Sequence, residues 1–185
     1  MQKLQEREAS SILVFVWLVM YVLAQRTDLD LLLCAKGSNT VGMELWRFFT
    51  AGFVQTNLFH TLGNVYLIYW LGTKYEKEIG SFRFFTTGFF GSTVAYIVYG
   101  LIYPNATNCV GGSGFWYALA GELLIRQLRN KDFTKSGQKW LIIYALVFLP
   151  IIPIIPGMNY GTVVFHVTAF VFGMIGGFIP DWSKS

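Results

Sequence analysis

The stretch GGSGFWYALAGELLIRQL, residues 111–128, constrains both the fold and the chemistry of this chain more than any other. It begins with Gly111, Gly112 and Gly114 around Ser113, and these glycines permit a tight turn and a close approach of backbones. The apolar run that follows predicts a helix with Ser113 at its N-terminus, where free N–H groups and the macrodipole favour negative charge. A serine in this position is a candidate nucleophile, and the rest of the sequence has to supply its base.

The composition is that of a polytopic membrane protein. The chain has 185 residues, of which 54% are hydrophobic, 18% aromatic and 13% charged, with a mean hydropathy of +0.49. This composition excludes an ordinary soluble domain, and the length suits one membrane domain over 1–185. We expect no nucleic-acid partner and no soluble cofactor. We also expect no metal site, because Cys34 and Cys109 have no histidine or cysteine partner at ligand spacing.

Apolar segments predict an all-α bundle of six transmembrane helices, since a spanning helix needs about 20 mostly apolar residues. The expected segments lie at about 10–24, 58–72, 82–102, 113–128, 140–155 and 160–179. The first is expected to be a retained span, because no small-residue cleavage site follows it. Three prolines end the fifth segment, which suits a mobile element or simply a broken helix.

The basic residues predict the orientation in the membrane. With a cytoplasmic N-terminus, eleven Lys and Arg residues lie inside and three outside, so both termini are expected in the cytoplasm. The three outside are Arg26, Lys36 and Arg47. The long outer connection, 25–57, mixes charged with large apolar residues, so we expect it to lie on or partly in the membrane interface, although a plain linker is the alternative.

Three polar side chains are expected at the same depth as Ser113. His60 and Asn64 are one helical turn apart near the outer end of the second segment, and His166 lies about two turns into the sixth. His166 is the candidate general base, while His60, Asn64 and the Ser113 N–H are candidate donors for an oxyanion. No Asp or Glu is near His166 in the sequence, which favours a dyad over a triad.

Each residue alone also has a purely structural interpretation, because small residues and packed histidines are common in membrane bundles. The set at matched depth favours a function. Two other polar groups are interpreted as structural: Glu122 with Arg126 as an i,i+4 pair, and Glu76 in the turn after the second segment.

These residues resemble the rhomboid family of intramembrane serine proteases over about 44–177. The resemblance rests on four motifs in order: Glu44-Leu45-Trp46-Arg47-Phe48-Phe49-Thr50, Phe59-His60-Thr61-Leu62-Gly63-Asn64, Gly111-Gly112-Ser113-Gly114, and His166 followed by Ala169, Gly173 and Gly177. It implies a rhomboid-like six-helix bundle with Ser113 as nucleophile and His166 as base. It also implies that His60, Asn64 and the Ser113 N–H bind the oxyanion, and that Tyr117 packs against the imidazole.

Two positions depart from the family pattern. Gln55 stands where the family often has a further histidine, and Ala169 stands where glycine is usual. The added methyl group at Ala169 is expected to push the fourth and sixth helices slightly apart. A disulfide between Cys34 and Cys109 is left open, because both lie outside by the predicted topology.

The expected function is that of an intramembrane serine endopeptidase. The resemblance implies substrates with a transmembrane helix, cut near the outer face of the bilayer through an acyl-enzyme. The alternative is a non-catalytic rhomboid-like protein that binds transmembrane helices, and a small transporter ranks last for want of a buried charge track. The absence of extra domains suggests a minimal bacterial form in the cell membrane.

Overall fold

The computed structural model describes residues 8–37, 44–131 and 160–180, together with positions 139, 142, 143 and 145. Within these residues the chain is helical, and its one extended pairing is an isolated antiparallel bridge between Ala35 and Cys109. The long helices are α1 (Glu8–Ala24), α5 (Leu58–Leu71), α7 (Ser81–Ile102), α8 (Ser113–Asn130) and α10 (Tyr160–Gly177). The short elements are α2 (Leu29–Leu33), α4 (Trp46–Thr50), a 3-10 turn at Ala51–Phe53, a π-helical turn at Gly72–Glu76 and α6 (Lys77–Ile79).

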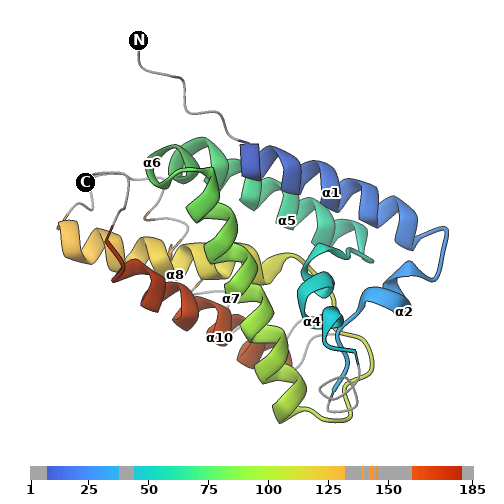
Figure 1. Ribbon diagram of the computed structural model, residues 1–185. Coiled ribbons are helices and arrows are strands. Elements are labelled where there is room, and N and C mark those ends of the chain that lie inside the picture. The colour runs from blue at the N-terminus through green and yellow to red at the C-terminus, as the bar shows by residue number, and fades with distance from the viewer. Residues whose placement is uncertain are drawn as a thin grey trace.

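Helix α8 is the central element of the bundle. Thirteen of its 18 residues are buried, which is why its sequence is apolar or small around most of its circumference. Helices α7 and α10 both pack against α8 and against each other, and α10 runs beside α8 in the same direction (Figure 1). Helix α1 lies along α5, and this pair meets α7 and α8 (Figure 1).

The helices around α8 expose large apolar side chains. Phe15 of α1, Phe59 of α5, Phe82 of α7 and Ile175 of α10 are 68%, 83%, 83% and 62% exposed. Such surfaces suit contact with lipid tails rather than with water. Two helices, α7 and α10, are long and apolar enough to cross a bilayer, and α1 is a shorter apolar helix.

The bundle has two ends with different chemistry. Helix α6, the N-terminus of α1 and the C-termini of α8 and α10 lie together at one end, which we name the α6 end (Figure 1). Helices α2 and α4 and the loop 103–112 lie at the other end, which we name the α4 end (Figure 1). Ser113 begins α8 and therefore belongs to the α4 end.

Glu76 caps the first helix at the α6 end. Its carboxylate accepts hydrogen bonds from the backbone N–H groups of Ala9, at 2.8 Å, and Ser10, at 3.0 Å. It also accepts a bond from the Ser81 hydroxyl at 2.6 Å. Because the first N–H groups of a helix have no intrahelical acceptor, this carboxylate supplies one and matches the positive end of the dipole. The expected structural role of Glu76 is therefore confirmed.

A buried ion pair ties α8 to its two neighbours at the same end. Glu122 is fully buried and pairs with Arg83 of α7 at 2.6 Å and with Arg126 at 3.7 Å. Arg83 also donates to the carbonyls of Gly176 and Ile179, near and just beyond the end of α10. Both arginines approach the same carboxylate oxygen, Oε1, while Oε2 is buried without a hydrogen-bond partner among the described residues. The pair that the spacing of Glu122 and Arg126 predicted is present, but the shorter partner of Glu122 comes from another helix.

The predicted segments agree with the helices wherever the structure describes them. The second segment was expected to end at residue 72, whereas α5 ends at Leu71 and continues as the π-helical turn. In that turn a side chain at Gly72 would meet the Ser10 hydroxyl, so glycine lets α1 approach and reach Glu76. Most of the expected fifth segment, 140–155, and its prolines lie outside the described residues.

Candidate active site

Hydrogen bonds hold the turn that precedes Ser113. The Gly111 N–H donates to the Ala51 carbonyl at 3.1 Å, and the Tyr96 hydroxyl donates to the Gly111 carbonyl at 2.8 Å. Gly111 has a φ of +131°, which side-chain-bearing residues rarely adopt. A Cβ at this position would also lie 2.7 Å from Cε1 of His60. Glycine is therefore required at 111 both by the backbone and by the neighbouring imidazole.

The two other glycines of the motif admit close neighbours. A Cβ on Gly112 would lie 2.2 Å from the indole of Trp17, and one on Gly114 would lie 2.6 Å from the Ser92 hydroxyl. Contacts this short do not occur between real side chains, so a larger residue would displace α1 or α7. The head of α8 is consequently enclosed on several sides, which fixes the position of Ser113.

Ser113 and His166 are in direct contact, as the sequence predicted. The Ser113 Oγ lies 2.7 Å from the His166 Nε2, and the two residues are 6% and 4% exposed. The other ring nitrogen, Nδ1, is buried beside the Thr162 backbone, without a hydrogen bond of good geometry to any described residue. A proton on Nδ1 leaves Nε2 as an acceptor for the serine hydroxyl.

Aromatic rings surround the imidazole. The Tyr117 ring packs on His166 with centroids 4.3 Å apart at 33°, and Phe165 meets it edge-on at 5.2 Å. Tyr117 is one turn after Ser113 on α8, so a single helix positions both the hydroxyl and the ring that packs on its base. Among the described residues, ring packing rather than a carboxylate orients this histidine.

Helix α5 brings His60 and Asn64 to the same region. Asn57 caps this helix by accepting a hydrogen bond from the His60 backbone N–H at 3.0 Å, and the His60 ring lies against Gly111. Asn64 is buried, and its Oδ1 accepts a bond from the Trp116 indole at 3.1 Å. Within the described part of the chain, neither His60 nor Asn64 hydrogen-bonds to Ser113 itself. His60 thus lies against the turn before the nucleophile, and Asn64 is tied to Trp116, three residues after it.

Comparison with known proteins identifies the family. The Rhomboid domain matches residues 42–183 of the chain. The chain belongs to the rhomboid family. A curated relative, RHOMBOID-like protein 1 of Arabidopsis thaliana, is 28% identical in an alignment of 145 positions that covers 74% of this chain and 34% of the relative. The chain therefore spans about a third of the length of that relative. The family and the apolar helices together indicate a membrane protein.

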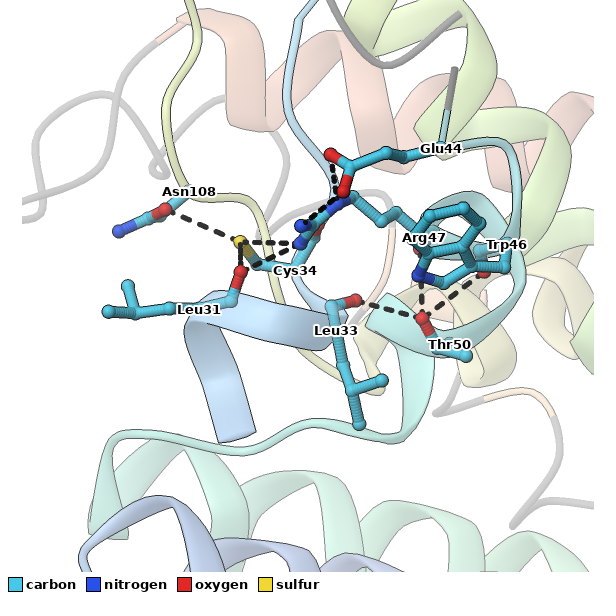
Figure 2. Close-up of polar contacts among 8 residues, drawn as sticks. All are labelled: Leu31, Leu33, Cys34, Glu44, Trp46, Arg47, Thr50 and Asn108. Carbon is cyan, nitrogen blue, oxygen red and sulfur yellow. Dashed lines mark hydrogen bonds and ion pairs between the residues drawn. The ribbon is translucent and has the colours of Figure 1, made fainter. Parts of the chain in front are cut away.

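The rhomboid tryptophan–arginine motif anchors the segment between α1 and α5. Figure 2 shows the Arg47 guanidinium between the Glu44 carboxylate and the backbone that ends α2. Arg47 is buried, bonds Glu44 twice at 2.8 and 2.9 Å, and donates to the carbonyls of Leu31 at 2.7 Å and Cys34 at 3.4 Å. The arginine thus ties α4 to α2.

Both cysteines are free thiols in this region. The Cys34 thiol donates to Asn108 Oδ1 at 3.3 Å (Figure 2), while Ala35, the next residue, pairs with Cys109 through the backbone. Burial raises the pKa of the Cys109 thiol to about 12. The disulfide that the sequence left open is absent from the structure, and the backbone bridge joins the two segments instead.

Small residues bring α8 and α10 together, which is what places Ser113 beside His166. A Cβ on Gly173 would lie 1.8 Å from the Ala118 carbonyl oxygen, and one on Gly121 would lie 2.0 Å from that of Phe170. Backbones in such close contact are typical of small-residue interfaces between membrane helices. Ala169 is fully buried, and the serine and histidine lie within hydrogen-bond distance with alanine at this position.

Sequence reasoning missed two residues of this site, Trp116 and Tyr96. Each supplies a polar hydrogen from an apolar helix, Trp116 to Asn64 and Tyr96 to Gly111. Trp116 could have been predicted to take part in the site, because it is close to Ser113 in the sequence and a buried indole N–H usually has a hydrogen-bond partner. The described residues contain no group of three or more His, Cys, Asp or Glu that could hold a metal ion.

Proposed function

We propose that this chain is an intramembrane serine endopeptidase that cleaves transmembrane segments of other membrane proteins. The observation that carries the proposal is the buried contact of 2.7 Å between Ser113 Oγ and His166 Nε2. A hydroxyl is a weak nucleophile until a base accepts its proton, and these two atoms are at the distance such a transfer needs. Membership of a family that includes serine proteases supports the same conclusion.

The catalytic steps follow from the groups at the head of α8. His166 Nε2 takes the Ser113 proton as the oxygen attacks the scissile carbonyl carbon, and the carbonyl oxygen becomes an oxyanion. The Ser113 N–H, at the start of a helix, and the side chains of His60 and Asn64 donate to that oxyanion. The protonated His166 then gives its proton to the leaving amine, which leaves an acyl-enzyme on Ser113. Water hydrolyses the ester by the same steps, with His166 again as base.

The membrane arrangement is part of the proposal. Residues 1–185 form one rhomboid-like domain of six spanning helices, with both termini and the α6 end in the cytoplasm and the α4 end near the outer face. Lys74, Lys77, Arg126 and Arg129 lie at or near the α6 end, in agreement with the excess of positive charge on the cytoplasmic side of membrane proteins. The substrate is a protein with a transmembrane helix in the same bilayer, and the membrane is that of a bacterial cell.

Labelling with a fluorophosphonate probe tests this proposal directly. The purified protein should react covalently at Ser113, and the Ser113→Ala and His166→Ala variants should not. The same three proteins, reconstituted with a single-span test substrate, should show cleavage near the outer face by the wild type alone. A folded wild type that neither labels nor cleaves would contradict the proposal and favour a non-catalytic protein that binds transmembrane helices.

A further inference from the structure

Three side chains from three segments form a hydrogen-bonded chain next to the nucleophile. The Trp116 indole Nε1 of α8 donates to Oδ1 of Asn64 of α5 at 3.1 Å. The Asn64 Nδ2 donates in turn to Oε1 of Gln55, which precedes α5, at 3.2 Å. All three residues are buried, with 3%, 2% and 0% of their surface exposed. Without water around them, their hydrogen bonds depend on one another.

The direction of this chain is determined by the indole. The indole nitrogen can only donate, so Asn64 must present its carbonyl oxygen to Trp116. The amide nitrogen of Asn64 then points away from Trp116 and toward Gln55, which must present its own carbonyl oxygen. Asn and Gln side chains are otherwise free to turn by 180°. Trp116 therefore removes an ambiguity that neither amide could remove alone.

The orientation leaves one donor of Asn64 available. Its Nδ2 carries two hydrogens, of which Gln55 takes one, and Asn64 makes no third hydrogen bond within the described residues. His60, one turn earlier on the same face of α5, lies against the turn before Ser113. With the opposite orientation, Asn64 would present an acceptor, which an oxyanion repels.

At the Gln55 end of these hydrogen bonds, the orientation of the amides leaves one buried group unsatisfied. The Gln55 Nε2 is buried and has no hydrogen-bond partner within the described part of the structure. An unsatisfied buried donor destabilises the folded protein. At the Trp116 end, ring packing connects these hydrogen bonds to the base: the Trp116 ring packs on Tyr117, with centroids 3.9 Å apart, and Tyr117 packs on His166.

We propose that Trp116 and Gln55 are positioning residues that orient the Asn64 carboxamide so that its nitrogen faces the developing oxyanion. Trp116 imposes the orientation and Gln55 stabilises it by accepting the first Nδ2 hydrogen, which leaves the second for the reaction. This inference rests on the proposed function, since it assigns a catalytic purpose to an orientation that the hydrogen bonds define.

A double-mutant cycle in kinetics tests the inference. Trp116→Phe keeps an aromatic ring and removes the donor, so kcat should fall about tenfold with little change in KM, because part of the population then presents the wrong amide atom. In an Asn64→Ala background the same substitution should change kcat less than about twofold, since no amide is left to orient. An equal loss in both backgrounds would overturn the inference.

Two further variants guard against a general packing defect. Gln55→Met removes the acceptor at similar volume, and its loss of kcat should likewise disappear in the Asn64→Ala background. Trp17→Phe is the matched control, because the Trp17 indole is also buried but donates to the Gly52 carbonyl at 3.0 Å. Any loss caused by Trp17→Phe should be the same in both backgrounds. If Trp116→Phe does not fold, Gln55→Met is compared in the wild-type and Asn64→Ala backgrounds instead, and an equal loss of kcat in both would overturn the inference.

A parallel cycle on unfolding separates the failure of this inference from failure of the proposed function. Trp116→Phe and Asn64→Ala should be non-additive in resistance to denaturation, because they break the same hydrogen bond. Additive effects would overturn the inference even if the wild type cleaves its substrate. If the effects of the two substitutions on unfolding are non-additive but the wild type never cleaves a substrate, the proposed function and the catalytic purpose are overturned. The orientation of Asn64 would still stand.

Discussion

The two ends of α8 bury polar groups in opposite ways. At the α6 end, Glu122 is charged and sits between two arginines, and Arg83 and Arg129 bind the last carbonyls of α10. At the α4 end, the buried groups around Ser113 are neutral in the arrangement described, and side chains bond to one another as donor and acceptor. Charges near a helix end can be paired and left in place, whereas a site deep in hydrocarbon is less costly when neutral.

The two ends of the bundle therefore differ in role: the α6 end holds the helices together, and the α4 end contains the candidate active site. The ion pair and the helix caps hold three helices in register and need not change during a reaction. Under the proposed function, the hydrogen bonds at Ser113 have to exchange protons and accept a substrate, and there they are few. Four variants test this distinction, and their expected effects on cleavage decrease from the first to the last.

The largest effect is expected from His60→Ala at the α4 end. Removal of one oxyanion donor should lower kcat by about 10²–10³ with a small change in KM, because the interaction is made mainly in the transition state. Michaelis–Menten kinetics with a reconstituted substrate measure both constants. Tyr66→Ala is the control, since Tyr66 is on the same helix and 66% exposed. A similar loss in both variants would show that α5, rather than the imidazole, is responsible.

Gly173→Ala should have the next effect, because it disturbs the interface that joins both ends. The new methyl group meets the Ala118 backbone, so α10 must move and His166 with it, and a shift of about 1 Å can lower activity about 100-fold. Overpacking should also destabilise the fold by about 1–3 kcal/mol. Gly176→Ala is the matched control on the same helix, since its Cβ meets no atom within 4 Å. Equal activity of the two variants would contradict the role of this interface.

Glu122→Gln should affect stability more than catalysis. It leaves Arg83 and Arg126 without a counter-charge, and removal of one partner from a buried pair costs about 3 kcal/mol. Denaturation in detergent measures that loss, while kcat of the protein that remains folded should stay within about threefold of the wild type. A loss of kcat as large as that of His60→Ala would show that the α6 end takes part in the chemistry.

The smallest effect is expected from Glu44→Gln, and it should appear in how the melting temperature depends on pH. The hydrogen bond from Arg47 lowers the pKa of the Glu44 carboxyl in the folded protein. Its contribution to stability is therefore present above the ordinary glutamate pKa of about 4.3 and is lost as the pH falls through the lower folded pKa. The melting temperatures of the wild type and the variant should differ slightly at neutral pH and converge in acid. A constant difference would indicate that the charge of Glu44 plays no part.

Much of the site could be predicted because its residues are rare in their surroundings. The chain has two histidines, and both lie in apolar segments, so their cost in hydrocarbon already marks them. The position of Ser113 follows from the glycines around it, whereas the role of Tyr117 was implied by the resemblance to the rhomboid family. The helices were predictable for a related reason: long apolar runs have few alternatives in a membrane.

Trp116, Tyr96 and Gln55 could not be placed in this way. Each is an ordinary residue for its segment, and its role depends on which atom of another segment lies within 3.2 Å. The prediction about Ala169 stays a prediction, because whether a methyl group separates two helices depends on the space available to it. The partner of Glu122 at the shortest distance, Arg83, is 39 positions away in the chain and was not foreseen either.

The helical segments, the candidate serine and histidine, and the positions of small residues could be predicted from the amino-acid sequence alone, because they depend on local composition and on the high cost of polar groups in an apolar solvent. The distance of 2.7 Å between Ser113 and His166, the close backbone contact at Gly173 but not at Gly176, and the direction of the Asn64 amide came from the packing of the helices. Hydrogen bonds and contacts change over tenths of an ångström, and such distances arise only when the helices have packed.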